Sequence, residues 1–151
     1  MEESARRVSF DEVLKEQGYL IYTATGNSML PFLRQQKDII EIHPVQGKIQ
    51  KYQIALYKRR MTYVLHRCIS TTPYVFAGDH NTFKEYDVTD DMILGVVTKV
   101  IRKGKTIYQN NFLYKFYYHL WVDFFPVKVL IIRGKARLFS IAKRLLIRAR
   151  R

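Results

Sequence analysis

The sequence predicts a mainly β domain with a folded or barrel-like sheet, followed by a basic helical tail. Short runs rich in β-branched and aromatic residues alternate with turn residues through the first 110 positions, as expected for antiparallel strands. Beyond these positions, basic and apolar residues replace the mixed composition. We therefore divide the 151 residues into a β domain over residues 1–110 and an amphipathic tail over residues 111–151.

A short helix is expected near the start of the β domain. Ser9 and Glu12 have the spacing of a capping box, and Gly18 would end the helix. After it, β-branched and alternating segments separated by Gly, Pro and basic turns indicate a series of strands. The expected strands cover residues 19–23, 38–43, 52–57, 61–69, 74–77 and 92–101, with a last strand through Ile107.

One of these strands places a histidine on a defined face. Side chains alternate between the two faces of a strand, so His66 would share a face with Val64 and Cys68. The opposite face would carry Tyr63, Leu65 and Arg67. Neighbouring same-face residues of one strand do not converge as a nucleophile and its base must. We therefore interpret Cys68 as a core residue.

Cysteine and histidine usage predicts neither a metal nor a cofactor. Cys68 is the only cysteine, which excludes an internal disulfide and a CxxC motif. The four histidines have no metal-ligand spacing. They are His43, His66, His80 and His119.

Ser28 lies in a stretch with special backbone requirements. It follows Gly26, which can take positive φ or approach a ligand closely, and it precedes Pro31, which disfavours helix at Leu30. A serine held on such a bend can project its hydroxyl from a rigid edge. Taken alone, a serine among Gly, Asn and Pro is more often a turn residue whose hydroxyl bonds to the backbone.

Three separated motifs occur in a characteristic order. They are Gly26-Asn27-Ser28-Met29-Leu30-Pro31, Tyr63-Val64-Leu65-His66-Arg67 and Gly78-Asp79-His80-Asn81. Together with residues 37–40 and 95–97, they resemble the nucleophile box, base-bearing strand and acidic box of the signal peptidase I superfamily of serine peptidases, which also contains the self-cleaving SOS-type repressors. The resemblance covers roughly residues 20–101 and implies a signal-peptidase-like fold for the β domain.

The histidine indicates one branch of that superfamily. His66, 38 residues after Ser28, stands where the Ser/Lys branch has lysine, so the chain resembles the Ser/His branch of archaeal and endoplasmic-reticulum type. The resemblance implies Ser28 as nucleophile and His66 as general base, because an imidazole can take the proton of serine near neutral pH. It nominates Asp79 to orient His66, with Glu85 as the alternative. Glu85 stands where this branch usually has aspartate.

The resemblance also implies how the reaction and its substrate are supported. Backbone N–H groups around Ser28 would bind the oxyanion, with Gly26 allowing a close approach, and Met29 would be an apolar packing residue that directs the serine. The substrate would be an extended peptide lying alongside strands, with small side chains next to the cleaved bond. We expect a serine endopeptidase that cleaves a leader or signal peptide from a precursor protein.

The net charge of +13 is unevenly distributed. Residues 111–151 hold ten Lys/Arg and one acidic residue, so they carry +9 of this charge and leave +4 for the β domain. An ordinary balance of charge in the β domain argues against nucleic acid as a partner. The basic excess belongs to the tail.

The pattern of the tail favours an anionic membrane surface as partner. Apolar residues repeat at helical spacing from Leu138 to Leu146 among Lys and Arg, and aromatic residues gather at 117–121. Packing against the β domain or another protein is the alternative. Polar residues interrupt the apolar run over 112–132, so no spanning helix is expected. With no signal peptide visible, we expect a peripheral or monotopic membrane protein attached through residues 112–151, and otherwise a cytoplasmic one.

Two other functions fit parts of the sequence. A self-cleaving regulator of the same superfamily would use the same serine and histidine, but no helix-turn-helix pattern precedes residue 20. A non-catalytic basic module would bind anionic lipid or nucleic acid through the tail. Loss of activity on removal of the Ser28 hydroxyl separates the enzyme from this module.

Overall fold

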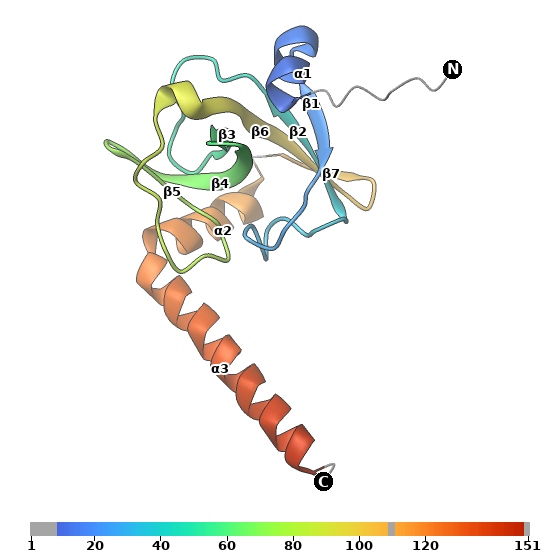
Figure 1. Ribbon diagram of the computed structural model, residues 1–151, viewed down its shortest axis with the longest axis vertical. Helices are drawn as coiled ribbons and strands as arrows, with labels where there is room; N and C mark the ends of the chain where they lie inside the picture. The colour runs from blue at the N-terminus through green and yellow to red at the C-terminus, as the bar shows by residue number, and fades with distance from the viewer. Residues whose placement is uncertain (1–8, 109–110, 150–151) are drawn as a thin grey trace.

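Seven antiparallel strands form one sheet in the computed structural model, which describes residues 9–108 and 111–149 (Figure 1). The strands are β1 (Leu20–Thr23), β2 (Asp38–His43), β3 (Ile54–Arg59), β4 (Thr62–Thr71), β5 (Tyr74–Ala77), β6 (Ile93–Arg102) and β7 (Lys105–Tyr108). The helices are α1 (Phe10–Gln17), the 3-10 helix η1 (Asp90–Met92), α2 (Phe112–Asp123) and α3 (Phe125–Ala149). The strand positions expected from the sequence are confirmed to within a few residues.

The long strand β6 holds the sheet together. The strand order is β1-β2-β6-β3-β4-β5, and β7 adds to β6. One edge of β6 pairs with β2, while its other edge is shared between β3 near Val96 and β7 near Val100. This arrangement joins β1 and β2 to the β3–β4–β5 meander that carries His66.

The expectation of a mainly β, barrel-like fold is wrong in part. Among the described residues, β1 and β5 end the strand order without pairing with each other, so the sheet is not closed into a barrel. Helices and strands occupy similar shares of the chain, which makes this a mixed α/β protein. The helical tail expected after residue 110 is present as α2 and α3, and together with α1 these helices make the fold mixed rather than mainly β.

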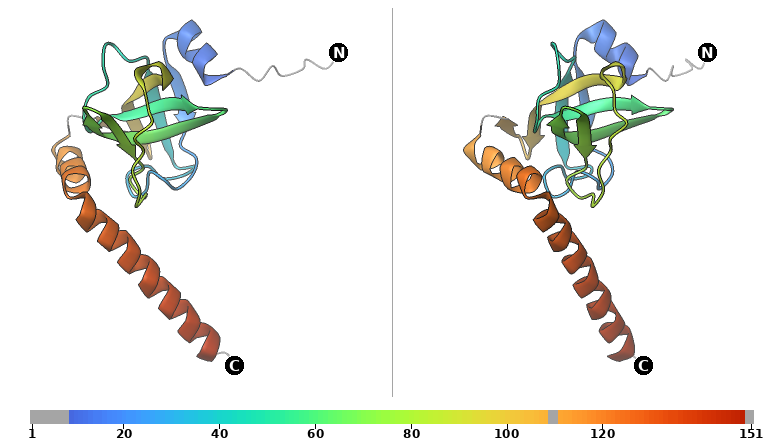
Figure 2. Two further views of the ribbon diagram at one scale, coloured as in Figure 1. Left: turned by 60° about the vertical axis from the view of Figure 1, so that its left-hand side comes forward. Right: turned by 90° about the vertical axis from the view of Figure 1, so that its left-hand side faces the viewer.

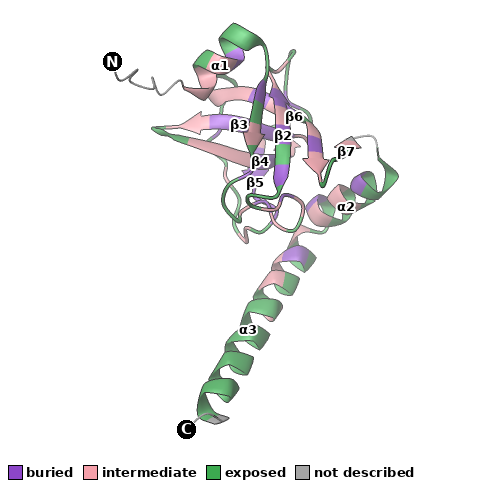
Figure 3. Ribbon diagram, turned by 90° about the vertical axis from the view of Figure 1, so that its right-hand side faces the viewer, coloured by how far each residue is buried: buried purple, intermediate pink, exposed green. Residues whose placement is uncertain are grey.

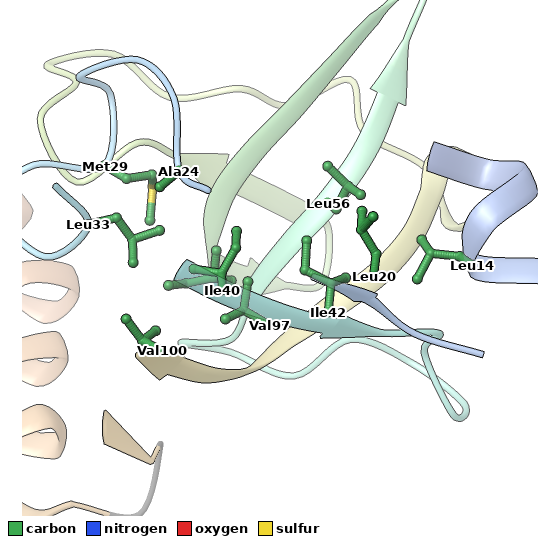
Figure 4. Packing of buried hydrophobic residues seen from close by; sticks show 11 residues of the cluster. Leu14, Leu20, Ala24, Met29, Leu33, Ile40, Ile42, Leu56, Val97 and Val100 are labelled. Carbon is green, nitrogen blue, oxygen red and sulfur yellow. The ribbon is translucent and has the colours of Figure 1, made fainter. Parts of the chain in front are cut away.

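Two apolar clusters lie on the two faces of β4. Leu65 packs against the first cluster, which includes Leu33, Ile40 and Leu56 (Figure 4), whereas Val64 packs against the second. Buried Cys68 belongs to the second cluster, and its pKa is raised to about 11 by burial. The predicted alternation along this strand is therefore confirmed, and a protonated thiol at neutral pH fits a core residue.

The N-terminal helix closes one end of the first cluster. The Ser9 hydroxyl accepts a hydrogen bond from the Glu12 N–H, and the Glu12 carboxylate accepts one from the Ser9 N–H, which confirms the predicted capping box. Phe10 then packs between Tyr22 of β1 and Tyr63 of β4, with ring centroids 4.9 and 4.7 Å away. The helix thus bridges two strands that do not pair with each other.

The tail consists of two helices with different surroundings. α2 packs against the β region, whereas α3 extends away from it (Figures 1 and 2). Beyond Lys128, most residues of α3 are exposed (Figure 3). Pro126 lies in the first turn of α3, where its missing N–H costs no helical hydrogen bond. Arg150 and Arg151 of the predicted basic tail lie outside the described residues.

Replacing Leu33 by alanine tests the core assignment. Leu33 is 1% exposed and lies five residues after Ser28. We expect Leu33→Ala to lower the free energy of unfolding by about 2–5 kcal/mol, because it removes buried methyl groups and leaves a cavity. Leu138→Ala, on the exposed face of α3, should change it by no more than about 0.5 kcal/mol. Urea unfolding measures both; similar losses would contradict the burial described here.

Candidate active site

The loop that carries Ser28 is held by hydrogen bonds where it leaves β1 and enters β2. Between β1 and β2, the Ala24 N–H donates to the Asp38 carbonyl at 3.0 Å and the Gln36 N–H donates to the Ala24 carbonyl at 2.9 Å. Met29 is buried in the first apolar cluster beside Leu33. The loop is therefore fixed both at its ends and by the packing of its middle.

Gly26 serves this loop through its backbone conformation. Its φ is 78°, in the region that favours glycine, and a Cβ there would meet nothing within 4 Å. The sequence left open whether positive φ or close approach explains this glycine. The structure shows positive φ, which turns the chain from β1 toward Ser28.

His66 is held by Glu85 and Tyr57. Its Nδ1 lies 3.0 Å from Glu85 Oε2 and 3.2 Å from the Tyr57 hydroxyl. The Tyr57 hydroxyl also donates a short hydrogen bond to Glu85 Oε2. With a carboxylate facing Nδ1, that nitrogen carries the proton in the neutral ring, and Nε2 keeps the lone pair. This tautomer is the one that a general base needs.

The backbone of Glu85 is tied to the sheet. The Glu85 N–H donates to the Phe76 carbonyl at 2.8 Å, and the Phe76 N–H donates to the Glu85 carbonyl at 2.9 Å. Because Phe76 belongs to β5, which pairs with β4, Glu85 is placed next to His66 by strand pairing. Burial acts to raise the pKa of the Glu85 carboxyl, but hydrogen bonds from His66 and Tyr57 outweigh it and hold that pKa below its usual value.

The Asp79 carboxylate binds Arg67 and does not contact His66 in the described hydrogen bonds. It accepts two hydrogen bonds from the Arg67 guanidinium, at 2.8 and 2.6 Å, and a third from the Tyr117 hydroxyl at 3.0 Å. Both members of this ion pair are buried. Of the two carboxylates proposed from the sequence, Glu85 therefore contacts His66, and Asp79 pairs with the next residue of β4.

The segment around Asp79 clamps the backbone of Ser28. The His80 N–H donates to the Ser28 carbonyl at 2.7 Å. A Cβ on Gly78 would lie 2.6 Å from that same carbonyl, so only glycine allows this approach. The acidic box therefore contacts the Ser28 segment through its backbone.

Both helices of the tail reach this clamp. Trp121 Nε1 donates to the Asp79 carbonyl at 2.6 Å, and Lys128 Nζ donates to the Gly78 carbonyl at 3.1 Å. Burial lowers the pKa of Lys128 to about 8. Tyr114 covers Arg67 and accepts a hydrogen bond from it at 2.7 Å. The start of the tail is consequently part of the structure that positions Ser28.

Ser28 and His66 line the same pocket of about 620 Å³. None of the described hydrogen bonds joins them directly; the Asn81 amide Nδ2 lies 3.5 Å from His66 Nε2 at the pocket wall. Catalytic hydrogen bonds of free enzymes are often longer than those of substrate complexes. The pocket is also lined by Gly26 and Glu85, so residues from all three sequence motifs and from the later acidic stretch meet there.

The pocket runs along strand edges. Residues 62–66 of β4 pair with β3 on one side, while β5 begins its pairing with β4 only at Arg67. Among the described residues, the other edge of 62–66 has no strand partner, and the same holds for one edge of β1. Both segments line the pocket. An extended peptide could add to such an edge by backbone hydrogen bonding.

Sequence reasoning missed the roles of Tyr57 and Arg67. The basic turn after residue 57 fixes the hairpin register that pairs Ala55 with His66, and Tyr57 is then the same-face diagonal neighbour of the histidine. The sequence therefore contained a signal for Tyr57, but using it required the pairing register of the β3–β4 hairpin. For Arg67, an arginine that follows Leu65 and His66 and precedes Cys68 on an interior strand indicated a buried partner.

Comparisons of the chain with protein-family models, with curated proteins and with solved structures found no match. Within residues 9–108 and 111–149, no group of three or more His, Cys, Asp or Glu side chains is arranged to hold a metal ion.

Neutralising Asp79 should destabilise the protein more than neutralising an exposed aspartate. We expect Asp79→Asn to cost about 3–5 kcal/mol of unfolding free energy, because it leaves the buried Arg67 charge uncompensated. The matched control is Asp87→Asn, whose ion pair with Arg59 is solvent-exposed and is worth at most about 1 kcal/mol. Denaturant unfolding of both variants measures the difference. Equal costs would show that the buried pair does not hold the fold.

Proposed function

We propose that the protein is a serine endopeptidase of the signal peptidase type, with a fold of that kind in its β region. Ser28 is the nucleophile, His66 the general base, and Glu85 the residue that orients His66. One observation carries the proposal: the histidine has Nδ1 on a carboxylate, while the ring borders the pocket that it shares with Ser28. An oriented histidine bordering the same pocket as a serine supports activation of that serine.

The reaction would follow from this arrangement. Ser28 Oγ attacks the carbonyl carbon of the peptide bond as His66 Nε2 takes the hydroxyl proton. Glu85 stabilises the imidazolium through the Nδ1–H bond and stays ionised. The proton then passes to the leaving amine, and a water molecule, activated by the same imidazole, hydrolyses the acyl-serine. Backbone N–H groups near Ser28 would hold the oxyanion, at about 3 kcal/mol for each donor.

The substrate we propose is a leader or signal peptide bound in extended form. Its backbone would pair with the unpaired edge of residues 62–66, which leads to His66. Mixed polar and apolar lining suits a peptide whose backbone is hydrogen-bonded and whose alternate side chains enter the pocket. The small side chains next to the cleaved bond remain an expectation from the resemblance.

Membrane association rests on α3 alone. The aromatic residues that favoured it in the sequence pack inward: Tyr117 and Trp121 bond to Asp79, and the Tyr118 ring stacks on Tyr52. α3, in contrast, exposes large apolar side chains among Lys and Arg and contains no acidic residue. None of the described helices is both long enough and apolar enough to cross a bilayer. We propose that α3 lies in an anionic membrane surface.

Four arginines give α3 its orientation. They are spaced by four, seven and four residues, which puts them along one side of the helix. Large apolar side chains such as Leu138, Ile141 and Leu145 occupy other positions around the helix and are exposed. The arginines are Arg133, Arg137, Arg144 and Arg148. In this proposal they contact lipid phosphates while the apolar side chains enter the acyl boundary.

Removing either partner of the nucleophile–base pair should abolish peptidase activity. We expect Ser28→Ala and His66→Ala each to lower kcat/KM on a leader-peptide panel by about 10³-fold or more, and the double variant to be no worse, because the two groups act as a unit. Ser140→Ala and His43→Ala are the matched controls and should retain activity. Turnover that survives Ser28→Ala would refute the peptidase and leave the lipid-binding module.

Neutralising the arginines of α3 should release the protein from anionic vesicles. We expect replacement of all four by glutamine to weaken binding to phosphatidylserine-containing vesicles by about 10²–10³-fold, since each basic residue contributes about 1 kcal/mol. A variant with the same change of net charge in the β region serves as control. It replaces Lys15, Arg60, Lys103 and Lys105 by glutamine. Equal losses in a sedimentation assay would show that total charge, not α3, determines binding.

A further inference from the structure

Tyr57 occupies an unusual position beside the proposed base. Its side chain is fully buried, packed against Phe76, yet its hydroxyl reaches the polar cluster at the pocket. There it bonds to Glu85 Oε2, the same oxygen that faces His66 Nδ1. Glu85 Oε2 therefore has two partners, His66 and Tyr57. The signal-peptidase resemblance assigns no role to Tyr57.

The phenol can act only as a donor to the carboxylate. Burial, followed by the hydrogen bond to Glu85, raises the pKa of Tyr57 well above its usual value, so the hydroxyl remains protonated at any physiological pH. Its proton points to Glu85, and its oxygen is left to accept from His66 Nδ1–H at 3.2 Å. The proton on Nδ1 thus lies between Glu85 and Tyr57.

We propose that Tyr57 is a positioning residue that shares the Glu85 carboxylate with His66 and sets how strongly that carboxylate supports the protonated imidazole. A donor on the carboxylate disperses its negative charge and weakens it as an acceptor from Nδ1–H. The phenol also fixes the carboxylate of the longer glutamate side chain, which stands where aspartate is usual in the resembling branch. This role rests on the proposed peptidase function.

Other charged groups around Glu85 are few. Arg59, two residues along β3 from Tyr57, places Nη1 3.5 Å from Glu85 Oε1 and forms an ion pair with Asp87. On the His66 side, the Asn81 amide is uncharged and faces Nε2. Tyr57 and Arg59 therefore approach different oxygens of the Glu85 carboxylate, and only Tyr57 acts on the oxygen that bonds to His66.

Removing the hydroxyl gives a directional test. In Tyr57→Phe the Glu85 carboxylate has one donor fewer, and its closer 3.0 Å contact with Nδ1 outweighs loss of the 3.2 Å contact to the phenol oxygen, so it stabilises the imidazolium more. The acid limb of the kcat/KM profile should therefore move to higher pH, by about one unit, which lowers kcat/KM on that limb about tenfold. Tyr74→Phe is the control, because Tyr74 packs on the same Phe76 ring but has no described bond to Glu85. Its limb should not move.

A second substitution at position 57 should move the acid limb of the kcat/KM profile in the opposite direction. Incorporation of 3-fluorotyrosine at position 57 keeps the ring and makes the phenol a stronger donor, so the acid limb should move to lower pH. If Tyr57 were purely structural, the two variants would not move the acid limb in opposite directions. If the limb stays in place in both variants, or moves the same way in both, the proposal is overturned.

A spectroscopic measurement separates this proposal from the peptidase function. The Nδ1–H resonance of His66, observed by NMR in the full chain without substrate, should move downfield in Tyr57→Phe because the bond to Glu85 strengthens. An unchanged resonance would overturn the role of Tyr57 even if the enzyme cleaves peptides. A shifted resonance in a protein that cleaves no peptide would leave the role of Tyr57 standing and refute the proposed function.

Discussion

The buried ion pair between Arg67 and Asp79 is the interaction on which the arrangement of the site depends. A guanidinium and a carboxylate removed from water need each other, because either one alone would be an uncompensated charge in a low-dielectric interior. Their pairing fixes the segment that contains Gly78 and His80 against β4, and that segment in turn grips the carbonyl of Ser28. The loop that carries Ser28 is therefore positioned by an ion pair that includes neither Ser28 nor His66.

Strand β4 carries this constraint and the proposed base on consecutive residues. Since neighbouring side chains of a strand point to opposite faces, His66 faces Tyr57 and Glu85 while Arg67 faces Asp79 and α2. A shift of the β3–β4 register by one residue would exchange these faces and disrupt both sites together. The Tyr114 hydroxyl of α2 and the Lys128 amine of α3 then connect this region to both helices of the tail.

Local patterns explain which parts could be predicted from the sequence. The capping box at Ser9 and the alternation along β4 depend on neighbours in the chain, and both were predicted correctly. The choice between Asp79 and Glu85 depends on which side of β4 each carboxylate reaches, and spacing does not contain that information. The aromatic residues of α2 look the same in sequence whether they meet lipid or a buried ion pair. Their inward packing follows from the polar groups of Arg67 and Asp79 that they cover.

Covalent labelling of the serine tests the central claim most directly. The full-length protein would be treated with a small panel of serine-directed electrophiles, including a fluorophosphonate and a β-lactone, and the modified residue would be identified by peptide mass spectrometry. Activation by His66 predicts an adduct on Ser28 that is lost in His66→Ala, with the other serines unmodified. An adduct on Ser28 that forms equally fast without the imidazole, or no adduct on Ser28 with any member of the panel, would contradict the account.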